Sequence, residues 1–219
     1  MTSSTSSLLK DPSLLDLHGY DTSETFPVFN PADPESIVGH VPIMNGASAK
    51  QAIEQSHQAL PQWRDGTTAA FRSSLLTKWS QMIQENAEDI ATIMTLESGK
   101  PVQESRGEVS YGTSFLDFFA AEAVRQNGAG GGMLLPTSFS TSEGKPRGHV
   151  MAMQQAVGVT AIVTPWNFPI AMITRKLGPA LAAGCTSVLK PAQLTPLTAV
   201  ALQNLAERAG FPPNVLQLM

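Results

Sequence analysis

The 219-residue sequence has few of the residues that form disulfides, bind metals or enter membranes. Its one cysteine, Cys185, excludes an internal disulfide, and no Asn-x-Ser/Thr glycosylation site occurs; both absences are typical of a reducing compartment. The four histidines are far apart and lack the spacing of metal ligands, so no metal site is predicted. No run of about 18 apolar residues occurs, so no membrane span is predicted.

Positive charge is also scarce. The 14 Lys and Arg residues are scattered among 18 Asp and Glu, for a net charge of −4, so neither a nucleic-acid partner nor a membrane surface is expected. Residues 1–25 are rich in Ser and Thr, and their first part lacks arginine and a long apolar run. Such a segment is a poor match to a secretory signal or a mitochondrial presequence. We therefore interpret residues 1–25 as a flexible lead and predict a cytoplasmic location.

The apolar spacing changes along the first half of the chain. Apolar runs interrupted by Pro and Asp predict two short strands within residues 26–41. From Ser48, a plausible N-cap, the period becomes helical. Helices are expected from there to about residue 63, from about Thr68 to Ile83, over 87–97 and over 102–125. Gly99 lies where a residue past a helix C-terminus is expected.

Residues 127–148 are rich in Gly, Ser and Pro and are interpreted as a mobile connection. The segment starts with Gly128-Ala129-Gly130, which invites comparison with the dinucleotide-binding fingerprint. We reject that interpretation, because Met133 stands where the third glycine is needed and a helix, not a strand, precedes the segment.

The pattern after residue 149 is the clearest. Apolar strands and amphipathic helices alternate over 157–163, 170–183, 186–189, 197–209 and 215–218. Short joints between them predict parallel strands with right-handed crossovers. The predicted class is α/β, with amino-terminal helices and an incomplete doubly wound parallel sheet.

Parallel strands bring their carboxyl ends to one edge, where open α/β folds bind ligands. Asn167 follows the first of these strands and Lys190 ends the second, so both are expected at one crevice. An amide can donate to an oxygen that gains charge, and an ammonium suits ribose hydroxyls or phosphate. A solvated lysine and a turn asparagine remain the alternatives. Cys185 precedes the second strand, at the opposite edge, and is interpreted as a small buried thiol.

Two motifs at this edge, PWNFP (165–169) and KPAQLTP (190–196), resemble signatures of the aldehyde dehydrogenase family. The stretch between them, and WSQMIQENAEDIATIMTLESGKPVQESRGEVSYG before them, resemble its succinate-semialdehyde branch. The similarity covers residues 26–219. It implies the amino-terminal part of a Rossmann-like cofactor domain, with the catalytic domain absent from these residues.

The resemblance also implies a chemistry. The family oxidises an aldehyde with NAD or NADP: a cysteine thiolate attacks the carbonyl, hydride goes to the nicotinamide, and water releases the acid. Asn167 resembles the oxyanion donor and Lys190 the lysine at the adenosine ribose. Thr164, Pro165 and Trp166 resemble the lining of the cofactor cleft.

Two further residues bear on specificity. Arg175 resembles an arginine that pairs with the distal carboxylate of a small aldehyde substrate, a task that suits a bidentate guanidinium; an ordinary exposed arginine is the alternative. Gln193 stands where many NAD-preferring relatives carry a glutamate that repels a 2′-phosphate. Its neutral amide predicts that NADP is accepted and slightly favoured over NAD.

Residues 1–219 contain no counterpart of the family's glycine-rich loop, base glutamate or nucleophilic cysteine. We therefore expect this chain to be inactive on its own. The alternatives are a non-catalytic nucleotide-binding or interaction module, and a product that folds poorly because apolar sheet edges are exposed. The family forms homo-oligomers through a strand extension, for which residues 133–153 are the candidates.

Overall fold

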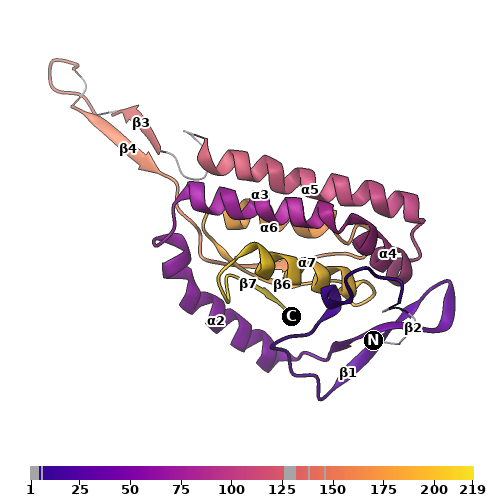
Figure 1. Ribbon diagram of the computed structural model, residues 1–219. Helices are drawn as coiled ribbons and strands as arrows, with labels where there is room; N and C mark the ends of the chain where they lie inside the picture. The colour runs from indigo at the N-terminus through magenta and orange to yellow at the C-terminus, as the bar shows by residue number, and fades with distance from the viewer. Residues whose placement is uncertain (1–4, 6, 126–131, 138, 146) are drawn as a thin grey trace.

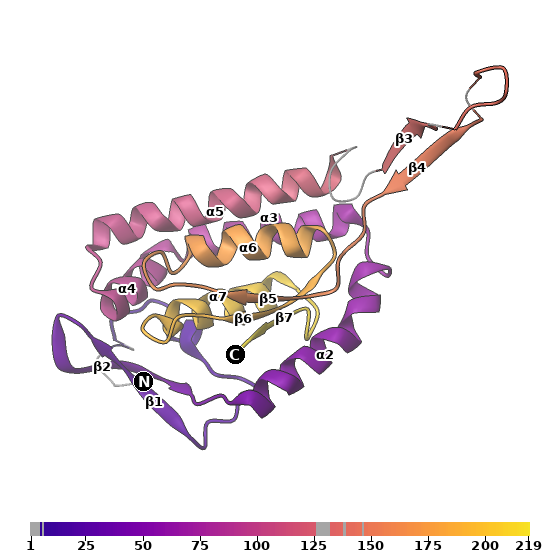
Figure 2. The same ribbon diagram turned by 180° about the vertical axis from the view of Figure 1, so that it is seen from behind.

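The computed structural model describes residue 5 and residues 7–125, 132–137, 139–145 and 147–219. Its body is layered. Within the described residues, a three-stranded parallel sheet lies between helix α2 (Gly46–Arg64) on one face and helices α6 (Ala171–Ala182) and α7 (Pro196–Ala209) on the other (Figure 1). Helices α3 (Ala69–Glu85) and α5 (Val102–Val124) form an outer layer against α6, as the view from behind also shows (Figure 2).

The sheet brings distant parts of the sequence to one edge. Its strands lie in the order β5 (Val159–Val163), β6 (Thr186–Lys190) and β7 (Leu216–Leu218), all parallel. The central strand β6 is buried on both faces until its last residue, as expected for a central strand of a parallel sheet that helices cover on both faces. The predicted α/β class, with parallel strands joined by helices, is confirmed.

The core lies between the sheet, α7 and the helices packed on it. Trp79 of α3 is fully buried, and its indole Nε1 donates to the carbonyl oxygen of Leu202 in α7 at 3.0 Å. The buried residues of α3 repeat at helical spacing, which confirms the predicted amphipathic helix: Arg72, Leu75, Leu76, Trp79, Ser80 and Ile83. Burial of one such large side chain contributes roughly 2 kcal/mol or more of transfer free energy, so this face fixes α3 against α7.

Helix α2 begins earlier than the sequence analysis expected, and the prediction of Ser48 as its N-cap was wrong. Asn45 is the N-cap: its side-chain oxygen accepts hydrogen bonds from the backbone N–H of Ala47 at 2.8 Å and of Ser48 at 3.2 Å. The hydroxyl of Ser48 in turn accepts from the backbone N–H of Asn45 at 3.4 Å. Ser48 is thus the second member of a capping box, because asparagine is at least as good a cap as serine and comes first.

Helix α4 (Ala87–Ser98) ends at Gly99, as the sequence predicted. Gly99 has a φ of +73°, a left-handed conformation that glycine adopts without strain. A Cβ at this position would lie 2.9 Å from Cγ of Pro31. Both facts favour glycine here and fix the direction in which the chain enters α5.

Part of the expected flexible lead is packed against the body, which corrects the prediction for residues 9–17. A short 3-10 helix, η1 (Pro12–Leu15), buries Leu14 completely. Asn204 of α7 donates through Nδ2 to the carbonyl of Leu14 at 2.8 Å, and Asp89 accepts from two successive backbone N–H groups of the lead at 3.0 and 2.7 Å. The Ser/Thr-rich composition concealed this contact, because two adjacent leucines are sufficient to anchor a short segment.

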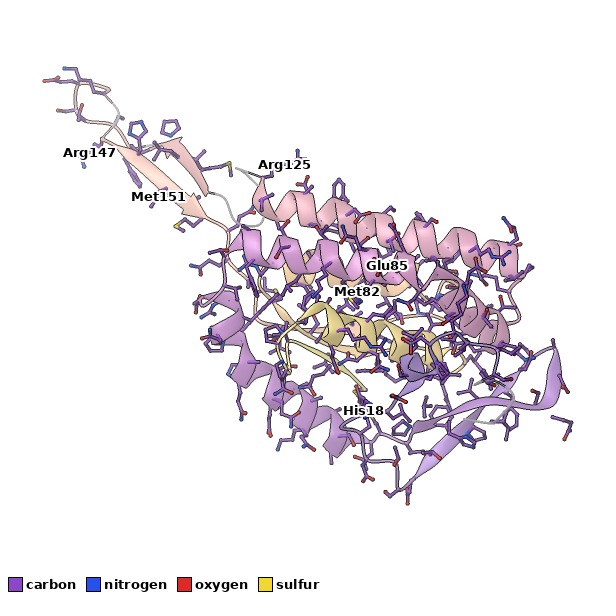
Figure 3. All side chains as sticks on the ribbon, viewed as in Figure 1. His18, Met82, Glu85, Arg125, Arg147 and Met151 are labelled. Atoms are coloured by element: carbon purple, nitrogen blue, oxygen red, sulfur yellow. The ribbon has the colours of Figure 1, made fainter. Side chains whose placement is uncertain are left out.

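Two antiparallel hairpins flank the layers. Strand β1 (Thr25–Asn30) pairs with β2 (Asp33–Pro42), so the two short strands predicted there are confirmed. Strand β3 (Gly132–Pro136) pairs with β4 (His149–Met153) and forms an arm that projects from the body (Figure 1). Figure 3 shows Met151 on this arm, far from the helices.

The arm corrects the prediction of a mobile connection over 127–148. Its first strand lies inside that range, because the apolar run Met133-Leu134-Leu135 pairs with residues 150–152 of the second strand. The glycine composition indicated flexibility, whereas the pairing partner lies beyond the range. Residues 128–130, which start the rejected fingerprint, lie outside the described residues.

Candidate functional site

The carboxyl ends of β5 and β6 lie side by side. Val163 pairs with Lys190, and the backbone N–H of Thr164 donates to the Lys190 carbonyl at 3.2 Å. Thr164 is buried, whereas Pro165 and Trp166 after it are exposed. Of these three predicted cleft residues, Trp166 offers the larger accessible surface, and Thr164 anchors the turn to the neighbouring strand.

Asn167 lies in the turn between β5 and α6 and is exposed. Its side-chain amide has no hydrogen-bond partner among the residues that the structure describes, so it can donate to a ligand. Pro165 and Pro169 flank the turn and restrict its backbone. A neutral donor in a restricted turn suits an oxygen that gains negative charge during a reaction.

A buried ion pair contacts the backbone of this turn. Lys100, just after α4, pairs with Glu108 of α5, and their side chains are 14% and 2% exposed. Lys100 Nζ donates to the Asn167 carbonyl at 3.0 Å and lies 4.4 Å from the centroid of the Phe168 ring. Glu108 Oε1 accepts from the backbone N–H of Ile170 at 2.9 Å. One ion pair therefore contacts the turn in its middle, at Asn167, and at its end, at Ile170.

Lys190 and Gln193 line a cavity of about 350 Å³ at the carboxyl ends of β6 and β7. Both side chains are exposed, and Lys190 Nζ has a weak contact with the carbonyl of Pro191 at 3.4 Å. The other walls are mainly apolar and include Leu17, Phe26, Val41, Pro191, Pro196 and Val200. An apolar wall beside an ammonium and an amide fits a nucleoside, whose base is flat and apolar and whose ribose carries hydroxyls.

The prediction that Asn167 and Lys190 face one crevice is confirmed only in part. They lie at the same edge of the sheet, because their strands end level with each other. The cavity beside Lys190, however, is not lined by Asn167 or by Arg175. The edge therefore carries two separate groups of predicted site residues.

The loop that carries Lys190 and Gln193 leads into α7, whose start is fixed by a residue of another helix. Glu97 of α4 is buried and accepts from the backbone N–H of Leu197 at 2.7 Å and of Thr198 at 3.0 Å, and from the Thr198 hydroxyl. It thereby satisfies N–H groups that the first turn of a helix leaves free. Burial raises the pKa of Glu97 to about 8, against the hydrogen bonds from Thr198, which lower it.

Arg175 lies in α6 and is exposed. Its guanidinium Cζ is 5.7 Å from the ring centroid of Phe115 in α5, and it forms no salt bridge within the described part of the chain. Its charge is thus available to a carboxylate. The same geometry fits an ordinary surface arginine, so its predicted role as a substrate clamp stays a prediction.

Cys185 is 2% exposed and has a free thiol. It directly precedes β6 and so lies at the amino edge of the sheet, opposite Asn167. The prediction of a small buried thiol away from the crevice is confirmed.

Sequence reasoning missed three charged residues beside the site: Glu97, Lys100 and Glu108. A signal was present for two of them. Glu97 continues the buried face of α4 that Ile90 begins, and Glu108 lies beside Val109 on the buried face of α5. An acid on an apolar helix face needs a buried partner. The partner itself could not be read from the sequence, because it comes from elements far along the chain.

The comparisons with known proteins show the family. The aldehyde dehydrogenase family matches residues 19–219. The chain belongs to this family. A glutarate-semialdehyde dehydrogenase of Pseudomonas aeruginosa is 48% identical over 200 residues, which are 91% of this chain and 39% of that protein. The NADP+ succinate-semialdehyde dehydrogenase GabD of Escherichia coli is 42% identical over 216 residues, 98% of this chain and 42% of that protein.

Solved structures of the same family resemble this chain in fold. A succinate-semialdehyde dehydrogenase from Burkholderia pseudomallei superposes with a TM-score of 0.86 at 42% identity, over 96% of this chain and 43% of that one. The chain thus spans about two-fifths of the length of these relatives. The predicted family and the resemblance to succinate-semialdehyde dehydrogenases are confirmed.

Two features are absent from the described residues. No helix there is long and apolar enough to cross a membrane. Nor do those residues contain a group of three His, Cys, Asp or Glu side chains that could hold a metal ion.

Proposed function

We propose that these residues form the cofactor-binding part of an NAD(P)-dependent dehydrogenase that oxidises a short semialdehyde with a distal carboxylate, such as succinate semialdehyde. The observation that carries the proposal is the pairing of Lys190 and Gln193 beside a cavity of about 350 Å³ at the carboxyl edge of the sheet. The semialdehyde dehydrogenases among the relatives support the substrate class.

The residues at the cavity suit NADP or NAD. When bound, the nicotinamide cofactor supplies the acceptor for the hydride that leaves the aldehyde carbon. Lys190 brings an ammonium to the ribose or a phosphate, and Gln193 brings an amide without negative charge. Because no carboxylate stands at Gln193 to repel a 2′-phosphate, we expect NADP to bind at least as well as NAD.

Two residues are assigned to the substrate. Asn167 donates a hydrogen bond to the carbonyl oxygen as it gains negative charge; one such donor accounts for about 2.7–4 kcal/mol in a well-built oxyanion site. Arg175 pairs with the distal carboxylate through its guanidinium. Both side chains are exposed, as groups that await a ligand must be.

The proposed oxidation needs a cysteine thiolate at the carboxyl edge of the sheet, and residues 1–219 place no cysteine there. Cys185 is buried at the opposite edge. We therefore propose that this chain alone binds the cofactor without turning over the aldehyde. The same observation favours the second candidate function, a non-catalytic nucleotide-binding module.

A second copy of the chain is the partner we propose for the β3–β4 arm. The arm exposes large apolar side chains, with Leu134 68% and Met151 71% accessible. Apolar side chains exposed along a projecting hairpin favour association. The cytoplasmic location stays a prediction from composition.

The proposal is tested by assaying the purified chain for NADPH formation with succinate semialdehyde and for binding of the cofactor. We expect no turnover and saturable binding of the cofactor. Turnover that disappears in Cys185→Ala would contradict the assignment of Cys185 as a buried structural thiol. Cys185→Ser nearly keeps the volume but also lacks the thiol, and circular dichroism of both variants shows whether a loss of activity reflects misfolding.

A further inference from the structure

The contacts of Lys100 and Glu108 have a consequence beyond stability. Lys100 and Glu108 pair with each other, and each also bonds to the turn that carries Asn167. Lys100 Nζ donates to the backbone carbonyl of Asn167 at 3.0 Å, and Glu108 Oε1 accepts from the backbone N–H of Ile170 at 2.9 Å. The Ala171 N–H reaches the same oxygen at 3.3 Å. These contacts span the second half of the turn, from the backbone carbonyl of Asn167 to the first amides of α6.

Helix α6 has no cap of its own. Its N-cap residue, Ile170, has no side-chain hydrogen bond to the first turn. Glu108 supplies the missing acceptor from α5, with a negative charge that also suits the positive end of a helix. Close contact keeps this acceptor in place: a Cβ on Gly112 would lie 2.3 Å from Cγ2 of Ile170, so the two helices approach as near as glycine allows.

The positive partner is fixed as well. Lys100 follows Gly99, whose left-handed conformation sets the direction of the chain between α4 and α5. The ammonium of Lys100 lies 4.4 Å from the Phe168 ring centroid. A buried carboxylate costs several kcal/mol unless it is paired. Glu108 is 2% exposed and Lys100 is its partner, so the ion pair cannot leave the turn without leaving a buried charge.

We propose that Lys100 and Glu108 are positioning residues for Asn167. They fix the backbone from the carbonyl of Asn167 to the first amides of α6, and with it the direction in which the Asn167 side chain leaves the backbone before any ligand arrives. A donor that is already oriented stabilises a developing charge without reorganising. This inference rests on the proposed role of Asn167, and neither residue touches the reacting atoms.

The test uses the 219-residue chain, labelled with ¹⁵N, and follows the side-chain amide of Asn167 and the backbone amides of residues 167–171 by NMR. In Lys100→Met we expect the Asn167 side-chain signals to shift and their heteronuclear NOE to fall. Lys100→Arg should restore both, because a guanidinium can reach the carboxylate and the carbonyl together. Lys78→Met, at an exposed lysine of α3, is the matched control and should change neither signal.

Hydrogen exchange tests the other half of the pair. In Glu108→Gln the Ile170 amide should exchange about tenfold faster, because a neutral oxygen is a weaker acceptor than a carboxylate. The proposal would be overturned if the Asn167 signals stayed unchanged in a folded Lys100→Met chain. It would also be overturned if the signals of the Lys100→Arg chain resembled those of Lys100→Met and not those of the wild type. The NMR readout needs no cofactor, so its failure is distinguishable from failure of cofactor binding, which would overturn the proposed function instead.

Discussion

Replacing Glu97 by glutamine should remove a large pH dependence from the stability of the fold. Glu97 is buried against the start of α7, and its carboxyl accepts from the amides of Leu197 and Thr198. Glutamine has nearly the same shape but keeps only one acceptor oxygen, whereas Leu197 and Thr198 bond to different oxygens of the carboxyl group. The lost acceptor lowers the free energy of unfolding equally at every pH, so a change in its pH dependence reports the lost titration.

The magnitude follows from the raised pKa of Glu97, about 8 against an ordinary value of 4.5. Between these values the folded protein holds a proton that the unfolded chain releases. The stabilisation is therefore fully present below about pH 4.5 and is lost as the pH rises through about 8. In that window the free energy of unfolding should fall by up to about 1.4 kcal/mol per pH unit from this group alone.

The assay is urea unfolding at pH 5.5, 6.5, 7.5 and 8.5 (roughly one-unit steps across the window in which the proton is held). The wild-type chain is compared with Glu97→Gln and with Glu104→Gln, a matched change at an exposed glutamate of α5. We expect Glu97→Gln to flatten the decline from pH 5.5 to 7.5, and Glu104→Gln to leave it unchanged. Equal pH dependence in all three would show that Glu97 is already ionised at pH 5.5 and would refute the reasoning.

Three further changes test other parts of the structure. Leu14→Ala should lower the free energy of unfolding by about 2–5 kcal/mol in urea titrations, whereas Leu8→Ala, at a side chain 60% exposed, should change it little; equal effects would contradict the packed lead. Gly112→Ala should lower the free energy of unfolding by about 1–3 kcal/mol, because its new Cβ would lie 2.3 Å from Cγ2 of Ile170, the N-cap of α6. Gly107→Ala in the same helix should not destabilise the fold, and thermal unfolding of both variants measures the contrast. Gln193→Glu should weaken NADP binding about tenfold relative to NAD, since the added charge repels the 2′-phosphate; calorimetry with both cofactors would contradict the proposed preference if the ratio stayed constant.

The regular elements were predictable because each has its own local signal. The α3 pattern around Trp79 and the strand that ends at Lys190 carry helical or β periodicity within a few residues. The order β5-β6-β7 followed from short helical joints, which leave few topologies open. The edge that holds Asn167 was therefore available from the sequence alone.

The errors and omissions share a physical cause, which is dependence on contacts between distant residues. Leu14 is anchored by Asn204 of α7, and no local pattern reveals that contact. Lys100 and Glu108 contact a turn far along the chain, so that turn could not be identified from the sequence around either residue. The Ser48 error was different: both residues of a capping box favour the same role, and only geometry shows which one takes it.

The central claim is that the cavity beside Lys190 holds a nicotinamide dinucleotide, and titration of the chain with NADPH tests it most directly. Cofactor fluorescence would be followed for the wild type, for Lys190→Ala and for Lys78→Ala, an exposed lysine outside the cavity. We predict saturable binding by the wild type and by Lys78→Ala, and binding at least about tenfold weaker in Lys190→Ala, as expected for loss of a charge-assisted hydrogen bond. A folded wild-type chain without saturable binding, or equal affinity in Lys190→Ala, would contradict the account.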